Sequence, residues 1–127
     1  MNGTIGAFVA TTKPEHARAF YRDTLGLKLV SEDPFALVFD GGGTVLRVQK
    51  VQSFTPHPFT AVGWNVPDVT AEVLALAAKG VTFERYSFFQ QDDKGVWTAP
   101  DGTGVAWFKD PDGNTLSLAQ SPRKRDI

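Results

Sequence analysis

Apolar and polar positions in the first half of the chain predict a strand, a helix and three further strands. Residues 4–10 are apolar, with the branched and aromatic side chains typical of a strand. A helix is expected next, with Thr12 as its N-cap, Pro14 in its first turn and Glu15 completing a capping box with Thr12. Apolar residues then recur at helical spacing, and Gly26 is expected to end the helix. Three strands follow, at residues 27–31, 35–39 and 44–51.

The second half repeats this order of elements. Residues 60–66 have a strand pattern, and a helix is expected to begin at Pro67 and Asp68 and to end near Gly80. The apolar side of this helix is expected to consist of Ala71, Val73, Leu74, Leu76 and Ala77. Strands are predicted at residues 81–84, 104–109 and 115–120, with a turn at 110–113. Residues 86–103 form a long polar segment, which is expected to fold as a loop over a cavity.

The two halves match through their turns. Gly26 corresponds to Gly80, and the turn and strand at residues 40–48 correspond to residues 110–118. The repetition predicts an α+β fold of two tandem βαβββ modules, in which each mixed sheet buries one face under its helix and curves around a cavity with the other. We expect a single domain, residues 1–127, composed of a module at about 4–51, a linker at 52–59, a module at about 60–120 and a tail at 121–127.

Composition and charge exclude several classes of function. The 127 residues are 42% hydrophobic and 21% charged, which is typical of one globular domain. Thirteen basic and fourteen acidic residues leave a charge of −1, so no field attracts nucleic acid. The absence of cysteine excludes disulfides, thiolate zinc sites and a cysteine nucleophile. No apolar run approaches the roughly 20 residues of a membrane span, and residues 1–4 lack a signal-peptide pattern, so a cytoplasmic location without membrane partners is expected.

Two sequence segments carry a family resemblance. Residues 20–27 (Phe-Tyr-Arg-Asp-Thr-Leu-Gly-Leu) and 108–114 (Phe-Lys-Asp-Pro-Asp-Gly-Asn), together with the repeated βαβββ unit, resemble the vicinal oxygen chelate superfamily. That superfamily contains glyoxalase I, extradiol dioxygenases, fosfomycin-modifying enzymes and bleomycin-resistance proteins. The resemblance covers about residues 4–120, and it implies the fold and a tendency to form homodimers. Its motifs are turns and packing positions, so they specify the fold better than the activity.

The resemblance also implies four positions for the ligands of a divalent metal, commonly His on the first strand and Glu on the last strand of each module. These positions fall on Gly6, Arg47, Ala61 and Ser117. Glycine and alanine have no donor atom, and arginine is a permanent cation, so this set does not suit a metal. We therefore expect neither a metal nor another cofactor. The two histidines, His16 and His57, are expected to be exposed and to take no part in a site.

Strand alternation predicts the lining of the cavity. The cavity side is expected to carry Gly6, Phe8, Ala10, Val45, Arg47 and Gln49 in the first module, and Ala61, Gly63, Asn65, Thr115, Ser117 and Ala119 in the second. Two roles are possible for the Arg47 side chain. It either grips a carboxylate or phosphate of a ligand, or it pairs with an acid such as Asp93 or Glu84 while its stem packs and its head reaches water.

Aromatic residues add an apolar wall to this cavity. Phe8 is expected to form the wall, and Trp97, Phe88 or Tyr86 to form a lid from the long loop. The other two tryptophans are assigned to packing, Trp64 under the second helix and Trp107 elsewhere. The small residues on the cavity side leave space, and few polar groups line it. Together they suggest that the ligand is a flat or apolar organic molecule. The candidate ligand-binding residues are Phe8, Arg47, Gln49, Asn65, Ser117 and Trp97.

The sequence leaves three functions open. The first is a binding protein for a small organic molecule, anionic or aromatic, in a metal-free cavity. The near-neutral charge argues against a strongly cationic drug such as bleomycin. The second is a metal-independent or weakly metal-dependent lyase or isomerase in which Arg47 holds a carboxylate or enolate. No catalytic residue is assigned, because the candidate acids, Glu84, Asp92, Asp93 and Asp101, are not placed on the central strands. The third is a regulatory or partner-binding module using the basic residues 123–125.

Overall fold

The computed structural model describes residues 1–122, which fall into two compact units. Unit 1 contains Met1–Val62 together with Asp110–Thr115, and unit 2 contains Gly63–Lys109 and the chain from Leu116 onwards. Two four-stranded mixed sheets with helices packed on them confirm the predicted α+β fold of two βαβββ modules. No helix in the described range is long and apolar enough to cross a membrane. The basic residues 123–125 lie outside that range.

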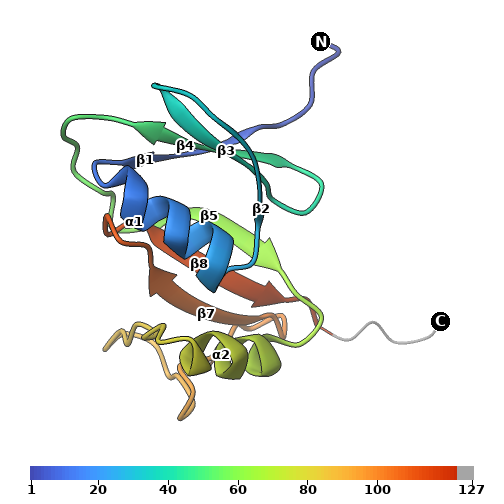
Figure 1. The fold of residues 1–127 in the computed structure, drawn as a ribbon. Coiled ribbons are helices and arrows are strands. Elements are labelled where there is room, and N and C mark those ends of the chain that lie inside the picture. The colour runs from blue at the N-terminus through green and yellow to red at the C-terminus, as the bar shows by residue number, and fades with distance from the viewer. Residues whose placement is uncertain (123–127) are drawn as a thin grey trace. The chain divides into compact units, whose positions relative to one another are not determined.

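Unit 1 builds its sheet from the first four strands, in the order β1-β4-β3-β2. Strand β1 is parallel to β4, whereas β3 is antiparallel to both β4 and β2. The helical segment between β1 and β2 lies along one face of this sheet (Figure 1). The elements are β1 (Ala7–Thr11), α1 (Pro14–Ala19), the π-helical turn η1 (Phe20–Thr24), β2 (Lys28–Glu32), β3 (Ala36–Asp40) and β4 (Val45–Lys50).

The core of unit 1 follows from strand alternation, as predicted. Leu46 and Val48 on β4 are buried under the helical segment, while Val45, Arg47 and Gln49 on the same strand are exposed. The fully buried residues also include Tyr21, Leu37 and Phe39. The sheet therefore has one apolar face that the helical segment covers and one open face, and a ligand has access to the open face.

The start of the first helix differs from the prediction. Lys13 is the N-cap residue and makes no side-chain cap hydrogen bond. The backbone N–H and hydroxyl of Thr12 instead donate to Oδ1 of Asp112, at 2.7 and 2.8 Å. A carboxylate brought by the fold accepts a stronger, charge-assisted hydrogen bond than the local capping box offers, so the tertiary contact prevails. The predicted ending is confirmed, because Gly26 takes a left-handed φ of 75°.

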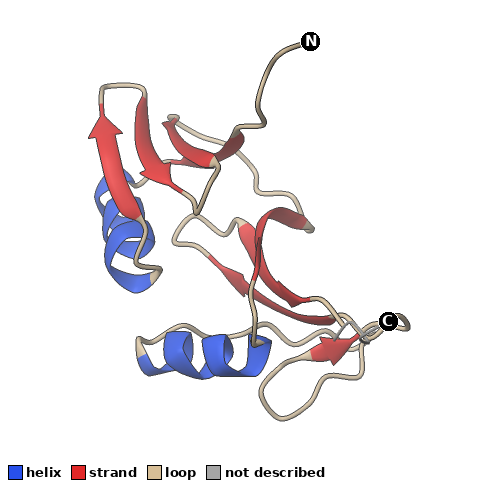
Figure 2. Cartoon of the chain, turned by 90° about the vertical axis from the view of Figure 1, so that its right-hand side faces the viewer, coloured by secondary structure: helices blue, strands red, loops and turns tan. Residues whose placement is uncertain are grey.

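Most residues of the second sheet, which has the order β5-β8-β7-β6, belong to unit 2. The helix start predicted at Pro67 and Asp68 agrees with α2, whose N-cap is Asp68; its carboxylate accepts from the backbone N–H of Ala71 at 3.0 Å. The helix covers one face of the sheet through contacts with β7 (Figure 2). The elements are β5 (Thr60–Asn65), α2 (Val69–Ala78), β6 (Trp97–Thr98), β7 (Gly104–Lys109) and β8 (Thr115–Gln120).

Two predicted features of unit 2 are wrong. Residues 81–84 do not form a strand; they contribute a single bridge, from Phe83 to Phe108, while the loop predicted at 86–103 contains the short strand β6. Phe83 and strand β6 both pair with the outer edge of β7, and neither is long enough to cover that edge alone. The buried side of α2 is Val69, Val73 and Leu76. Ala71, Leu74 and Ala77, which were also expected there, are exposed, because a helix that is apolar all round does not indicate which face packs inward.

Candidate functional site

The open face of the first sheet brings three of the six predicted ligand-binding residues together. Register places Arg47 on β4 beside Phe8 on β1 and beside Val38 on β3, so these side chains share one face. Gln49 is two positions further along β4 and points to the same side. Phe8 is 52% exposed, although it is a large aromatic residue in the middle of a strand. An exposed aromatic side chain beside a cation is suited to contact a ligand.

The guanidinium of Arg47 lies over the ring of Phe8 and has no acidic partner within residues 1–122. The guanidinium carbon lies 5.8 Å from the centroid of the Phe8 ring, a cation–π distance. The two acids considered from the sequence pair elsewhere, Glu84 with Lys109 at 3.5 Å and Asp93 with Lys94 at 3.3 Å. Within residues 1–122, Arg47 forms no ion pair. The guanidinium therefore lies over an aromatic ring, while its N–H donors have no acidic partner in the described range and are available to an anion.

The residues at the four implied metal positions do not fit a divalent cation. A Cβ built at Gly6 would lie 3.9 Å from Nη1 of Arg47, so a guanidinium reaches the place from which a first-strand ligand would extend. A fixed positive charge there repels a metal. Ala61 is exposed and has no donor atom, which leaves Ser117 as the only oxygen among the four. Among the described residues, no group of three or more His, Asp and Glu side chains is placed to hold a metal.

The other predicted ligand-binding residues, Asn65, Ser117 and Trp97, belong to the second sheet. Asn65 is exposed at the end of β5, and Ser117 on β8 is buried. A Cβ at Gly63 would clash with Oγ of Ser117, so β5 approaches β8 closely at this point, which is why glycine suits it. Trp97 on β6 is half-buried.

An aromatic cluster covers part of the second sheet. Trp97 is opposite Val105 in the ladder, and Trp107 is two positions further, so the two indoles share the face that points away from α2. Phe89 stacks on both, at 4.4 Å from Trp97 and 5.2 Å from Trp107 between ring centroids. Tyr86 packs against Trp107 at 5.5 Å. The long loop therefore folds onto the sheet of its own unit, with Phe89, which sequence reasoning missed, as the central ring.

Asp110 is the centre of a hydrogen-bonded polar cluster. From the sequence, only a turn was predicted at this position. The carboxylate of Asp110 accepts from the hydroxyl of Tyr21 at 2.6 Å, from the backbone N–H groups of Asp112 and Asn114 at 2.9 Å, and from Nδ2 of Asn114 at 2.9 Å. Burial, and next to it the Asp110 carboxylate, raise the pKa of Tyr21 above its ordinary value. Each donor and acceptor is paired and shielded from solvent, so this centre holds unit 1 together and offers no reactive group.

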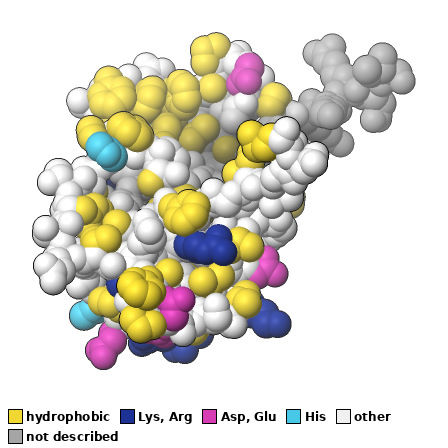
Figure 3. All heavy atoms as spheres, turned by 90° about the horizontal axis from the view of Figure 1, so that it is seen from above, with side chains coloured by type: hydrophobic (Ala, Val, Ile, Leu, Met, Phe, Trp, Pro, Cys, Tyr) yellow, Lys and Arg dark blue, Asp and Glu magenta, His cyan; other side chains and the backbone are white. Residues whose placement is uncertain are grey.

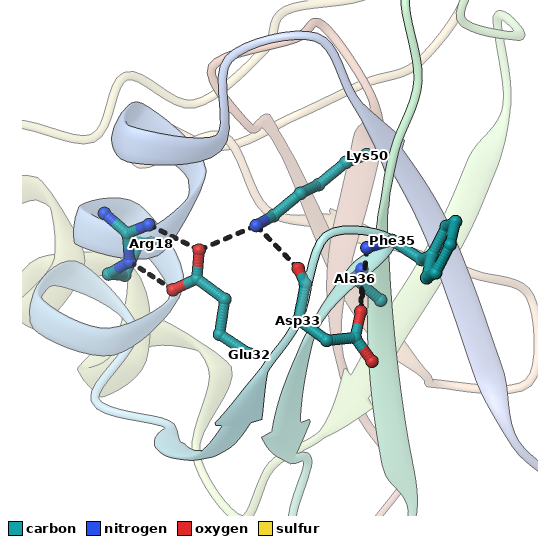
Figure 4. Close-up of polar contacts among 6 residues, drawn as sticks. All are labelled: Arg18, Glu32, Asp33, Phe35, Ala36 and Lys50. Atoms are coloured by element: carbon teal, nitrogen blue, oxygen red, sulfur yellow. Dashed lines mark hydrogen bonds and ion pairs between the residues drawn. The ribbon is translucent and has the colours of Figure 1, made fainter.

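A second charged cluster lies at the start of the first helix. Arg18 donates to both oxygens of Glu32, at 2.9 and 2.7 Å, and Nζ of Lys50 donates to Glu32 at 2.8 Å and to the carbonyl of Asp33 at 2.8 Å (Figure 4). The hydrogen bonds from Arg18 and then Lys50 lower the pKa of Glu32 to about 2. The cluster borders an open cavity of about 380 Å³, which also contacts His16. Because Arg18 and Lys50 are both engaged with the one carboxylate of Glu32, the cluster is a clamp between helix and sheet.

Charge elsewhere on the surface is mixed. Figure 3 shows one face of the molecule, on which Lys and Arg side chains lie beside Asp and Glu side chains. A charge of −1 for the whole chain agrees with this distribution. A ligand that reaches Arg47 is thus recognised by that guanidinium at short range, since no broad field attracts it from a distance.

Comparison with known proteins agrees with the fold. The family model described as the glyoxalase/bleomycin resistance protein/dioxygenase superfamily matches residues 5–118. No curated protein matches the sequence. Similar solved structures include lactoylglutathione lyase from Agrobacterium tumefaciens, with 18% identity and a TM-score of 0.73 over 94% of each chain.

Two further solved structures share the fold. One is a member of the glyoxalase/bleomycin resistance protein/dioxygenase superfamily from Sphaerobacter thermophilus DSM 20745, with 22% identity and a TM-score of 0.73 over 95% of this chain and 100% of that one. The other is the bleomycin resistance determinant encoded on the transposon Tn5, with 18% identity and a TM-score of 0.74 over 94% of this chain and 98% of that one. The match of the family model to almost the whole chain confirms the resemblance inferred from the turns: the chain belongs to the glyoxalase/bleomycin resistance protein/dioxygenase superfamily.

Proposed function

We propose that this protein binds a small organic anion with a flat or aromatic body, without altering it, on the open face around Arg47. The observation that carries the proposal is the exposed guanidinium stacked on Phe8, for which the described part of the chain supplies no carboxylate. A guanidinium binds a carboxylate or phosphate through two parallel hydrogen bonds. The exposed ring of Phe8 then contacts the body of the ligand, and Gln49 adds a polar side chain on the same strand.

Recognition of this kind does not depend on a metal. The donor set at the implied metal positions is unsuitable, and the positive charge of Arg47 supplies the electrostatic attraction that a metal supplies in other sites. The comparison with the Tn5 bleomycin resistance determinant supports a binding protein, since its name describes resistance and not a reaction. The near-neutral charge of this chain favours a ligand other than a strongly cationic drug.

A second candidate function is a metal-independent lyase or isomerase, favoured by the likeness to lactoylglutathione lyase. Arg47 would then hold a carboxylate or enolate while a base removes a proton. By register, the acid on the same face is Asp40, which is opposite Val45. The backbone N–H groups of Gly42 and Gly43 hold the pKa of Asp40 below its ordinary value, which makes it a weak base. This reasoning favours binding over catalysis.

The proposal includes a single functional domain that associates as a homodimer. Each sheet ends in edge strands, β1 and β2 in the first and β5 and β6 in the second, and an unpaired edge is a place where another chain docks. The third candidate, a partner-binding module that uses residues 123–125, stays a prediction because those residues lie outside the described range.

Native mass spectrometry of the purified, untreated protein is the first test. We expect a dimer mass without a stoichiometric divalent metal, with or without an additional small molecule. A metal that survives mild desalting would show that the assignment of the four positions is wrong, and the enzyme hypothesis would then lead.

Thermal shift with benzoate, 2-naphthoate and their uncharged amides tests the ligand class directly. We expect the carboxylates to stabilise the wild type, and Arg47→Ala to abolish this effect while retaining the melting temperature of the free protein, because Arg47 is exposed and forms no ion pair with residues 1–122. Arg22→Ala, which removes an exposed arginine from η1, is the matched control. Equal shifts from acids and amides, or equal shifts in the wild type and Arg47→Ala, would refute the proposal.

A further inference from the structure

The outer side of α2 is unusually apolar for a surface helix. Of its ten residues only Glu72 is charged, and Leu74 is 52% exposed in the middle of the helix. The residues around Leu74 on the exposed side are Ala71, Ala75, Ala77 and Ala78. A surface helix normally presents charged and polar side chains to water. This face therefore has the composition of a covered surface, and it lies on the opposite side of unit 2 from the aromatic cluster.

A groove runs beside this exposed apolar face. It has a volume of about 360 Å³, within the range of small-molecule sites. Its apolar lining consists of Val73, Leu74 and Ala77 from α2 and of Val81 and Phe83 from the segment that follows the helix. A groove of this size accommodates an aliphatic chain or a single ring, and is too small to seat a helix of a protein partner.

The rim of the groove has an excess of positive charge. It is formed by Arg85, Asp93 and Lys94. Arg85 is exposed and has no ion-pair partner in the range that the structure describes. Lys94 pairs with Asp93 at 3.3 Å, but the Asp93 side chain is 83% exposed, so this contact is weak and easily exchanged. The two cations leave one positive charge unbalanced beside an apolar floor.

The wall that carries the rim is held in place by polar contacts. Nε2 of Gln91 donates to the carbonyls of Glu84 and Gly95, at 2.9 and 2.7 Å, and its Oε1 accepts from the backbone N–H of Tyr86 at 2.8 Å. Gly95 has a φ of 88°, and a Cβ there would lie 3.4 Å from Cβ of Phe83, so the turn packs tightly onto the floor. The groove is thus already formed, which lowers the entropic cost of filling it.

We propose that this groove is a second binding site, for an amphipathic monoanion such as a medium-chain aliphatic carboxylate. The chain of the ligand lies on Leu74, Val73 and Phe83, and its carboxylate meets Arg85 and Lys94. The floor supplies hydrophobic burial, and the unbalanced rim charge supplies the preference for an anion. All of these residues belong to unit 2, so the site is independent of Arg47.

Calorimetric titration with octanoate, decanoate and 1-decanol tests the two halves of this proposal. Each CH₂ group buried on an apolar floor strengthens binding by a factor of about four, so decanoate is expected to bind about fifteenfold more tightly than octanoate. Decanol has the same chain without the charge, and weaker binding of decanol is expected. Equal affinities of octanoate and decanoate, or of decanol and decanoate, would overturn the proposal.

Variants locate the site. Arg85→Glu is expected to weaken decanoate binding about tenfold, and Leu74→Asp to remove it; both residues are exposed, so the fold is retained. Lys28→Glu, an equal charge change in unit 1, is the control and should bind as the wild type does. Loss of binding in Arg47→Ala with retention in Arg85→Glu would overturn the proposal by placing the carboxylate on the open face of the first sheet. Dissociation of a dimer by Leu74→Asp, without decanoate binding to the wild type, would overturn it by making this face a contact between copies.

Discussion

Tyr21→Phe is the sharpest test of how unit 1 is held together. Tyr21 has no exposed surface, and Asp110 is only 6% exposed, yet the Tyr21 hydroxyl donates to Oδ2 of Asp110 at 2.6 Å. Phenylalanine keeps the ring, and with it the contacts with Phe20 at 5.2 Å and Phe39 at 5.7 Å between centroids. The substitution therefore removes one hydrogen bond to a buried carboxylate and little else.

The expected loss of stability in Tyr21→Phe depends on the hydrogen-bond donors that remain on Asp110. A hydrogen bond to a charged group contributes about 1.5–3 kcal/mol. The carboxylate of Asp110 keeps the backbone N–H groups of Asp112 and Asn114 on Oδ1, and Nδ2 of Asn114 on Oδ2, so it is not left without partners. We therefore expect the free energy of unfolding to fall by about 2 kcal/mol, which for a chain of this length lowers the melting temperature by about 7 °C.

Urea denaturation followed by tryptophan fluorescence measures this change, with an unchanged m-value as the sign that the unfolding reaction is the same. Tyr86→Phe is the matched control, because Tyr86 is half-buried and its hydroxyl has no hydrogen-bond partner within residues 1–122. The control is expected to stay within 0.5 kcal/mol of the wild type, as about that much is ordinary for such a change. A loss below 0.5 kcal/mol in Tyr21→Phe, or about equal losses in the two variants, would refute the assignment of Asp110 as a stabilising centre.

Two further predictions concern the charged clamp and a close strand contact. The pKa of Glu32 lies at about 2 in the folded protein, below its ordinary 4.5, so its contribution to stability is present above pH 4.5 and is lost as pH falls toward 2. In Glu32→Gln the free energy of unfolding should fall less steeply across that pH window than in the wild type, as measured by urea denaturation at several pH values. Equal slopes in the two proteins would contradict this prediction. Gly63→Ala should lower stability by about 1 kcal/mol, because its Cβ would clash with Oγ of Ser117. Addition of Ser117→Ala should restore it, and a double variant no more stable than Gly63→Ala would show that the contact is not the cause.

Local pattern determined much of the fold and part of the candidate site. The predicted strands at 104–109 and 115–120 have the bounds of β7 and β8, and the alternation on β4 places Arg47 on the open face as expected. The start of α2 near Asp68 and the end of the first helical segment at Gly26 were also predicted. These features depend on neighbours within about one turn or on the two-residue period of a strand, so the sequence by itself contains the information.

Tertiary structure decided the features that depend on distant partners. Thr12 was expected to cap the first helix, but the carboxylate of Asp112, which is 100 residues away in sequence, takes its donors. Residues 110–115 lie far along the chain, and their contacts group them with residues 1–62 in unit 1. Phe89 became the centre of an aromatic cluster because β6 formed where only a loop pattern was visible. Local pattern specifies which side chains are available, whereas the partner of Arg47, Thr12 or Phe89 depends on which distant segment the fold brings within hydrogen-bond or van der Waals distance.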